Sequence, residues 1–377
     1  MKQGWKIKKL GDVSDIKTGK SNAVDADVNG KFTFFDRSKK IKKSNRYLFD
    51  CEALIIPGEG SQFFPRYYSG KFDLHQRVYS ISNFHKSVNI RFVEYFLIFN
   101  HKHFENVAVG ATVKSLRLRH FTEIEIPLPS LTEQKRIVAI LDKSFTAIAT
   151  AKENAQQNLQ NAKELFESYL QNVFENNKWE GKTLEQISDV FGRGKSKHRP
   201  RNDKKLFGGD YPFIQTGDIR NSEHCVTNYS QTYNEVGLSQ SKLWPKGTIC
   251  ITIAANIAET GVLSFEACFP DSVIGIVVNK ELADIDFVEY LLQSFKVNLQ
   301  ALSKGSAQDN INLGTFKDKL FPFPPVKKQQ QIVKKLNSLS AETKKLEGIY
   351  QQKINDLEEL KKSVLEKAFK GELKMVN

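Results

Sequence analysis

Two triplets with the composition of a phosphate-binding loop are the first residues that could carry chemistry. They are Gly19-Lys20-Ser21 and Gly194-Lys195-Ser196. A phosphate-binding loop also needs a glycine five residues before its second glycine, so that several backbone N–H groups surround the phosphates. Ser14 and Asp189 occupy those positions. We therefore interpret both triplets as turns that follow a strand or a helix.

No other pattern in the sequence favours an active site. The chain has no G-x-S-x-G, no H-E-x-x-H and no Asn/Asp-Pro-Pro-aromatic element of the kind seen in amino-methyltransferases, and its seven histidines are scattered. The four cysteines lie far apart, which predicts buried thiols in a reducing cytoplasm instead of a zinc site or disulfides. We expect no catalytic residue, no metal and no cofactor on this chain. An enzyme of unrecognised type, either a nuclease or a methylase, is the alternative.

Positive charge is concentrated in two segments. Residues 37–46 hold six cations and no acid, and residues 193–205 hold seven cations and one acid. The whole chain has a formal charge of +13, which indicates a polyanionic partner, most simply nucleic acid, with an anionic membrane surface as the weaker alternative. Lysines and arginines laid along phosphates release counterions and give salt-dependent affinity. Each run alone is also compatible with a solvated face that binds nothing.

The predicted DNA-binding residues are cations that could contact phosphates and polar side chains that could read base edges. In the first half of the chain they are Arg37, Lys39, Lys40, Lys42, Arg66, Gln76, Arg77, Lys114 and Arg117, with Arg119 nearby. In the second half they are Arg193, Lys195, Lys197, Arg199, Arg201, Gln215, Arg220, Asn221 and Gln308, with Asn310 nearby.

An internal duplication organises these residues. Residues 5–16 return as residues 179–190 at an offset of 174, and the Phe-Val-Glu-Tyr sequence of residues 92–95 returns at 287–290 at an offset of 195. The second copy therefore carries about 21 extra residues, inserted between 193 and 241. The copies differ most in their basic loops, which predicts two similar frames with different reading surfaces.

Each copy joins a mixed α/β globular part to a long helix. Short β-branched runs at 53–56, 78–81, 249–253 and 273–278 predict strands, and residues 92–100 and 287–295 predict helices. After Pro129 and Pro325, apolar residues recur every three or four positions, from Val138 to Val173 and from Ile332 to Val364, with a polar break at Lys152.

The sequence thus predicts an α+β protein with a pseudo-two-fold repeat. We expect a first domain at 1–130, a first long helix at 131–176, a second domain at 177–325 and a second long helix at 326–377. The two helices would pack as an antiparallel coiled coil; the alternative is that each packs on its own domain. No apolar run reaches the roughly 18 residues of a membrane helix, and no secretion signal is evident, so we expect a cytoplasmic protein.

The chain resembles the specificity subunits of type I restriction-modification systems along essentially its whole length. The matching segments are residues 5–12, 126–138, 211–219 and 360–373, and their order and repetition carry the resemblance. The first copy has Phe-Phe-Asp-Arg-Ser at 34–38 where the second has the family-like Ile-Gln-Thr-Gly-Asp at 214–218.

The resemblance implies two target recognition domains joined by long helices. It also implies a bipartite DNA site with a non-specific spacer, two methyltransferase subunits and additional motor/nuclease subunits. S-adenosylmethionine, ATP and Mg²⁺ are then expected on the partners. A stand-alone, non-catalytic DNA-binding coiled-coil protein is the alternative, as is a scaffold whose charge is incidental.

Equivalent positions on the two long helices are candidates for docking two identical partners. They are Gln134 and Ser168 in the first copy and Gln329 and Ser363 in the second. Helix capping and coiled-coil packing explain the same residues equally well, so both interpretations stay open at this point.

Overall fold

The computed structural model describes residues 4–175, 179–254, 256–304, 311 and 313–373. The chain divides into two compact units, the first comprising Met1–Gln157 with Gln351–Asn377 and the second Asn158–Tyr350. Each unit therefore contains one globular part and a segment of both long helices. Among the described residues, no helix is both long enough and apolar enough to span a membrane.

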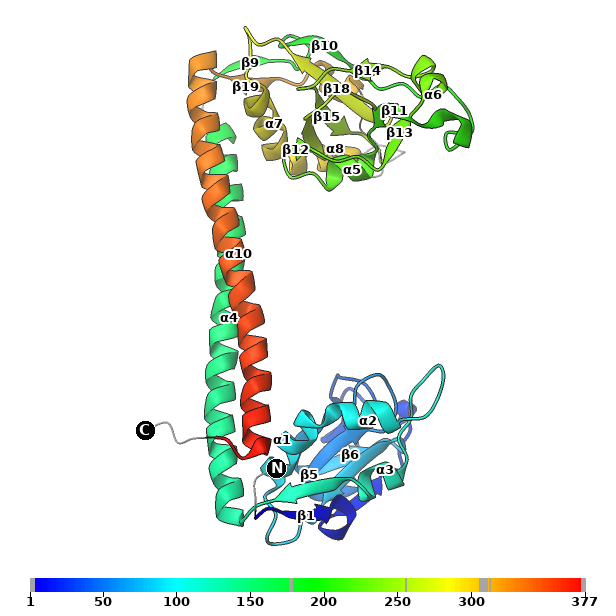
Figure 1. The fold of residues 1–377 in the computed structure, drawn as a ribbon, viewed down its shortest axis with the longest axis vertical. Coiled ribbons are helices and arrows are strands. Elements are labelled where there is room, and N and C mark those ends of the chain that lie inside the picture. Colours follow the sequence, from blue (N-terminus) through cyan, green and yellow to red (C-terminus); the bar gives the residue numbers. More distant parts are fainter. Residues whose placement is uncertain (1–3, 176–178, 255, 305–310, 312, 374–377) are drawn as a thin grey trace. The chain divides into compact units, whose positions relative to one another are not determined.

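Unit 1 has a six-stranded sheet in the order β2-β7-β5-β6-β3-β4 and a separate β1-β8 pair (Figure 1). The strands are β1 (Lys6–Lys9), β2 (Asp15–Thr18), β3 (Phe32–Phe35), β4 (Lys42–Ser44), β5 (Phe49–Pro57), β6 (Arg66–Leu74), β7 (Val78–Ser82) and β8 (Glu125–Leu128). The helices are α1 (Ile90–Phe99), α2 (His101–Val107) and α3 (Leu118–Thr122), with short 3₁₀ turns at Leu10–Asp12 and Ala23–Asp25.

Unit 2 has a five-stranded sheet in the order β10-β18-β15-β16-β12, a four-stranded sheet in the order β13-β11-β17-β14, and a β19-β9 pair. The strands are β9 (Glu180–Lys182), β10 (Ser188–Arg193), β11 (Phe207–Phe213), β12 (Cys225–Val226), β13 (Gln231–Tyr233), β14 (Leu243–Trp244), β15 (Ile249–Thr252), β16 (Thr260–Leu263), β17 (Ala267–Cys268), β18 (Val273–Val278) and β19 (Phe321–Phe323). The helices are α5 (Thr216–Arg220), α6 (Glu235–Ser239), α7 (Ile285–Ser294), α8 (Lys296–Lys304) and α9 (Leu313–Lys317), with a 3₁₀ turn at Lys204–Leu206.

The strand pairing repeats between the units, as the duplication predicts. The antiparallel set β2·β7, β5·β7 and β5·β6 of unit 1 corresponds to β10·β18, β15·β18 and β15·β16 of unit 2. Helices α1 and α7 each begin after an N-cap, Asn89 or Asp284, whose side chain accepts the backbone N–H of the third residue after it. The expected strands and the two short helices are confirmed.

The extra residues of the second copy build a structure that the first copy lacks. Strands β11 and β13 and helix α6 lie within the inserted region, and the two strands form half of the four-stranded sheet. In unit 1, β3 and β4 instead extend the single six-stranded sheet. The insertion therefore changes the surface next to the basic loop and leaves the shared frame intact.

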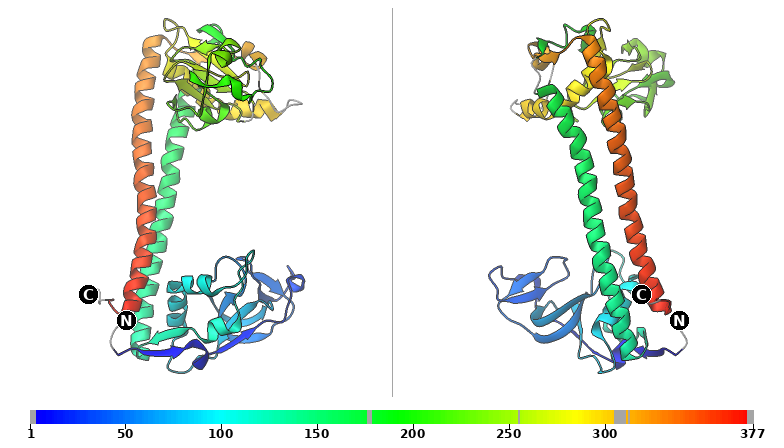
Figure 2. Two further views of the ribbon diagram at one scale, coloured as in Figure 1. Left: turned by 45° about the vertical axis from the view of Figure 1, so that its right-hand side comes forward. Right: turned by 90° about the vertical axis from the view of Figure 1, so that its left-hand side faces the viewer.

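The long helices are α4 (Leu131–Glu175) and α10 (Val326–Lys370), and segments of both lie side by side in each unit (Figures 1 and 2). In unit 1, Arg136 donates to the backbone oxygen of Leu373 at 3.3 Å, and Lys152 forms an ion pair with Glu358. A later residue of α4 therefore contacts an earlier residue of α10, so the paired segments are antiparallel. Lys152, the polar break of the heptad pattern, has an acidic partner on the facing helix.

Both long helices also contribute to the globular cores. The ring of Phe369 on α10 lies 5.4 Å from Phe92 and 5.5 Å from Phe96 in unit 1. Phe174 on α4 takes the corresponding place in unit 2, 5.2 Å from Phe287. Each globular part therefore packs on the end of the helix that belongs to the other copy, which neither sequence-based alternative anticipated.

The two glycines of the Gly-Lys-Ser triplets lie where backbones approach closely. A Cβ on Gly19 would lie 1.7 Å from the backbone oxygen of Leu74, and a Cβ on Gly194 would lie 2.2 Å from that of Phe269. Gly19 directly follows β2 and Gly194 directly follows β10. The triplets thus follow strands, and their glycines permit packing against the turn that precedes β7 or β18.

Candidate nucleic-acid interface

In unit 1, one carboxylate gathers arginines from two separate loops. Glu59 follows strand β5, and its two oxygens accept hydrogen bonds from Arg37 (2.6 Å) and from Arg77. Arg66, at the start of β6, donates to the backbone oxygen of Ser38 at 2.7 Å. Three predicted DNA-binding arginines, distant in sequence, therefore lie on one surface of the unit.

The loop that carries Lys114 joins this surface. Ser115 forms a bridge with Glu59, and the backbone N–H of Gly60 donates to the oxygen of Lys114 at 3.0 Å. The ammonium of Lys114 caps the backbone oxygen of Glu105 at 2.8 Å. Arg117 lies just beyond, exposed, at the N-cap of α3.

The predicted lysines Lys39, Lys40 and Lys42 lie in or next to the turn between β3 and β4. Asp36 accepts from the backbone N–H of Ser38 at 2.8 Å and forms an ion pair with Lys42 at 2.6 Å, while Lys39 and Lys40 are exposed. Burial acts to raise the pKa of the Asp36 carboxyl, but the hydrogen bonds from Lys42 and Ser38 lower it overall.

Gln76 lies in the turn between β6 and β7, next to Arg77. Its amide donates to the side chain of Asn22 at 2.6 Å, and it is exposed. This contact fixes the side chain at the edge of the same basic surface.

In unit 2, the acidic partner of the arginines is Asp271, which precedes β18. Its carboxylate lies 2.8 Å from Arg201 and 3.9 Å from Arg199, and its backbone oxygen accepts from Arg193 at 2.6 Å. Lys195 and Lys197, on the same loop, are exposed. In unit 2 a single acid therefore contacts cations that all belong to one basic run, whereas Glu59 joins arginines from two loops.

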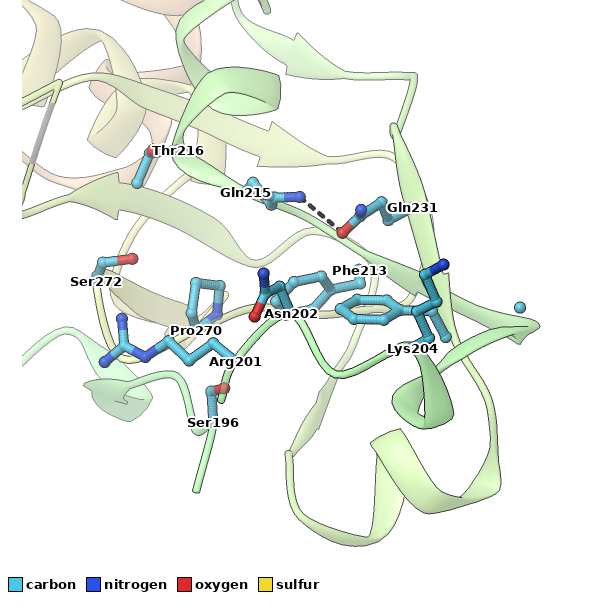
Figure 3. A pocket seen from close by; sticks show the side chains of 12 residues that line it. Ser196, Arg201, Asn202, Lys204, Phe213, Gln215, Thr216, Gln231, Pro270 and Ser272 are labelled. Carbon is cyan, nitrogen blue, oxygen red and sulfur yellow. Dashed lines mark hydrogen bonds between the residues drawn. The ribbon is translucent and has the colours of Figure 1, made fainter. Parts of the chain in front are cut away.

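Arg201 borders a cleft of about 620 Å³ that opens on the surface of unit 2 (Figure 3). Side chains that can both donate and accept hydrogen bonds line it together with the donor Lys204, namely Ser196, Asn202, Gln215, Thr216, Gln231 and Ser272. The amide of Gln215 donates to that of Gln231 at 2.9 Å, and the two side chains point toward one another in Figure 3.

Aromatic residues form part of the wall of this cleft. Phe207 and Phe213 line it, and the ring of Tyr233 stacks on Phe213 with centroids 4.0 Å apart. An aromatic wall beside amides and cations suits nucleotide surfaces, which combine flat rings, base edges and phosphates.

Two predicted residues of unit 2 lie away from the cleft, at the end of α5. Arg220 donates to Asn256 at 3.3 Å, and Asn221 borders a smaller hollow of about 230 Å³ with Cys225 and Tyr229. Gln308 and Asn310 lie outside the described residues.

Sequence reasoning missed Asn202, Lys204 and Gln231 as individual members of the cleft. Asn202 and Lys204 lie inside the basic run that we had identified, but only the fold shows that they face Gln215. Gln231 lies in the inserted segment of the second copy, and this location was the one feature of the sequence that could have indicated it.

The glutamines predicted as partner contacts have another role. Gln134 and Gln329 are completely buried. The Gln134 amide accepts from the backbone N–H of Asn89 at 2.8 Å and donates to the backbone oxygens of Ser87 and Pro129. This burial is at odds with direct partner contact and supports the capping interpretation.

The two serines lie inside the long helices. Ser168 is exposed on α4 and Ser363 is half-buried on α10. Each serine lies seven residues before the end of its helix. Neither serine is enclosed as the glutamines are, so both remain available to a partner.

Among the described residues, no group of three or more His, Cys, Asp or Glu side chains is arranged to hold a metal ion. What the two units offer is a pair of cationic surfaces with polar readers, each built on the repeated frame. Such surfaces can bind and discriminate a polyanion by charge and hydrogen bonding.

The fold and these surfaces agree with the comparison to known proteins. The chain belongs to the family described as the type I restriction modification DNA specificity domain, whose model matches residues 2–160 and again residues 176–359. It is a DNA specificity subunit of a type I restriction-modification system and a non-catalytic part of that complex.

Curated relatives match three quarters or more of this chain. The specificity subunit of the Escherichia coli enzyme EcoDI is 24% identical over 98% of this chain and 88% of its own length. The putative MjaX specificity subunit of Methanocaldococcus jannaschii is 24% identical over 75% of this chain and 66% of its own length.

Two solved structures share the fold. A chain from a study of complex assembly and conformational transition of the type I R-M system has a TM-score of 0.75, 16% identity and 99% coverage of both chains. The HsdS subunit of Thermoanaerobacter tengcongensis has a TM-score of 0.61, 17% identity and coverage of 99% of this chain and 98% of its own.

Proposed function

We propose that the chain binds a bipartite, asymmetric DNA site, with one half recognised by the globular part of each unit. The observation that carries this proposal is the pair of arginine clusters, at Glu59 and at Asp271, on one repeated frame. Because the surrounding loops differ between the units, the two half-sites would differ in sequence. The cations predicted from the sequence would contact phosphates, and the arginines and amides would read base edges.

The partners follow from the family and are part of the same proposal. Two methyltransferase subunits would dock on the helical segments, with Ser168 and Ser363 near the contact, and motor/nuclease subunits would join them. A chain of the same fold comes from a study of type I R-M complex assembly, which is consistent with a role in a complex. S-adenosylmethionine, ATP and Mg²⁺ would be bound by those partners, in the cytoplasm. The alternative is a stand-alone DNA-binding protein that recruits nothing.

The test is selection of duplexes from a random-sequence library by the full chain together with the methyltransferase subunit of its host. We expect an asymmetric motif in two parts. Arg77→Ala should weaken selection in one part only, and Arg201→Ala in the other part only, because these residues belong to different units.

Lys280→Ala is the matched control for Arg201→Ala. Lys280 is an exposed cation beyond the far end of β18, whereas Asp271 with its arginines precedes that strand. It should leave both parts of the motif unchanged. A single contiguous motif, or equal loss in both parts from either arginine variant, would count against one half-site per unit. Selection by the chain alone that the methyltransferase subunit does not alter would favour the stand-alone alternative.

A further inference from the structure

The carboxylate of Glu59 is buried more deeply than the arginines that it binds. Its side chain is 10% exposed, against 48% for Arg37 and 59% for Arg77. The backbone on either side is also fixed, because Gly58 donates to the oxygen of Arg77 at 2.9 Å and Gly60 donates to that of Lys114 at 3.0 Å. Glu59 is thus a largely buried acceptor, on a hydrogen-bonded backbone, for two solvent-facing donors.

The cluster carries more positive than negative charge. Two guanidinium groups share one carboxylate, and each contributes a single Nη1 atom to it. A guanidinium has five N–H donors in a planar fork, so most donors of Arg37 and Arg77 remain available for another acceptor. Burial acts to raise the pKa of Glu59, but the hydrogen bonds from both arginines lower it overall, which keeps the acid ionised near neutral pH.

Unit 2 has a related arrangement at a different place in the frame. The Asp271 side chain, 33% exposed, accepts a hydrogen bond from Arg201 at 2.9 Å and lies 3.9 Å from Arg199, which also donates to the backbone oxygens of Ser196 and His198. At the offset of 195, Asp271 corresponds to Gln76 and Glu59 corresponds to Ala254. The duplication therefore does not account for the pairing of an acid with two arginines in each unit, because the acid occupies non-equivalent positions in the two copies.

We propose that Glu59 and Asp271 are positioning residues that set sequence discrimination, by holding Arg37 with Arg77 and Arg199 with Arg201 so that their free donors meet the acceptor edge of guanine. This inference rests on the proposed DNA-binding function. Arginine is the side chain suited to bidentate pairing with guanine O6 and N7. Each half-site should accordingly contain at least one G·C pair.

The physical reason is the cost of ordering a flexible cation. An arginine without a partner samples many rotamers, and on DNA it can contact any phosphate, which adds affinity without discrimination. An arginine already bound to a fixed carboxylate has lost part of that freedom before DNA arrives. Its contact to a base edge then depends on that base being present.

The experiment measures the ratio of affinities for the selected duplex and for a shuffled duplex of equal composition. It uses the full chain with the methyltransferase subunit of its host. Glu59→Ala should lower this ratio about tenfold, the loss expected for one bidentate base contact, while affinity for the shuffled duplex rises and its salt dependence steepens. Asp271→Ala should do the same, with the relaxed base in the other half of the motif.

Asp15→Asn is the charge-matched control, since it removes one acid from an exposed ion pair with Lys17 in the same unit. It should leave the ratio unchanged. Glu59→Gln keeps the side-chain volume and covers the case in which Glu59→Ala does not fold; it should give a smaller loss of the same sign. In an Arg37→Ala/Arg77→Ala background, removing Glu59 should have no further effect on the ratio.

The outcomes separate the inference from the proposed function. If the wild-type complex selects no motif, the proposed function fails. If it selects a motif and Glu59→Ala leaves the affinity ratio intact, the positioning role is refuted. The same holds if Glu59→Ala changes the ratio equally in the Arg37→Ala/Arg77→Ala background. An equal rise in both affinities would mean that the acid only offsets charge, and that too would refute it.

Discussion

Replacing Gln329 by alanine should destabilise unit 2 without altering any surface. Its amide oxygen accepts from the backbone N–H of Asp284 at 2.8 Å, and its amide nitrogen donates to the backbone oxygens of Pro324 (2.8 Å) and Leu282 (3.4 Å). The side chain is completely buried. It therefore ties the first turn of α10 to the N-cap of α7.

The magnitude follows from these contacts. Two short hydrogen bonds and one long bond, at about 1 kcal/mol each, give a loss of about 2–3 kcal/mol, since three backbone groups lose their partner. For a unit of this size, about 2–4 °C accompanies each kcal/mol, so the melting temperature should fall by about 5–10 °C. Hydrogen exchange should accelerate in α7 and in the first turns of α10.

Gln330→Ala is an unusually close control. It changes the same residue type one position along the same helix, where the side chain is exposed, and it should leave stability within about 0.5 kcal/mol of wild type. Equal effects of the two substitutions would refute the capping role. A Gln329→Ala variant that keeps its stability but fails to bind the methyltransferase subunit would restore partner contact as the role of this residue.

Two other substitutions test the frame of unit 2. Gly194→Ala should lower the melting temperature of the unit, because its Cβ would lie 2.2 Å from the backbone oxygen of Phe269. Gly192→Ala is the control, since no atom lies within 4 Å of the added Cβ, and it should leave the melting temperature unchanged. Similar melting temperatures for the two variants would contradict the close approach at Gly194. Burial of the ring acts to lower the pKa of His224, but its hydrogen bonds to Asp286 and Glu289 raise that pKa to about 10. Because this value exceeds the unfolded one of about 6.5, the charged ring stabilises the unit fully below about pH 6.5, and this stabilisation is lost as the pH rises through about 10. His224→Gln should therefore flatten the pH dependence of unfolding in that window, and parallel profiles for the variant and wild type would contradict it.

The sequence was sufficient for the elements because they depend on local patterns, and for the repeat because the two copies share many residues at a constant offset. Short β-branched runs predicted β5, β7, β15 and β18, and the three- and four-residue spacing predicted α4 and α10 with bounds close to those observed. The heptad seam is less uniform than predicted, since Leu346 and Leu360 remain exposed. The polar break at Lys152 is compensated by Glu358 on the facing helix.

The candidate site could be predicted only as two basic loops. Composition marks Arg37 and Arg201 as cations, but it does not indicate which acid lies beside them, because Glu59 and Asp271 are remote from them in sequence. For Gln134 and Gln329 the sequence left partner contact and helix capping equally open. Their equivalent positions suggested a repeated external contact, whereas repetition of an internal contact produces the same pattern.

The position of Phe369 in the core of unit 1 has a consequence for folding of the chain during translation. Leu365, Ala368 and Phe369 are buried against residues that leave the exit tunnel far earlier, among them Phe92 and Leu141. The nascent first domain must therefore wait, with an apolar face uncovered, until the second domain and most of α10 have been synthesised. A nonsense codon or frameshift within α10 should consequently expose the amino-terminal domain to proteases, even though every residue of that domain has been made.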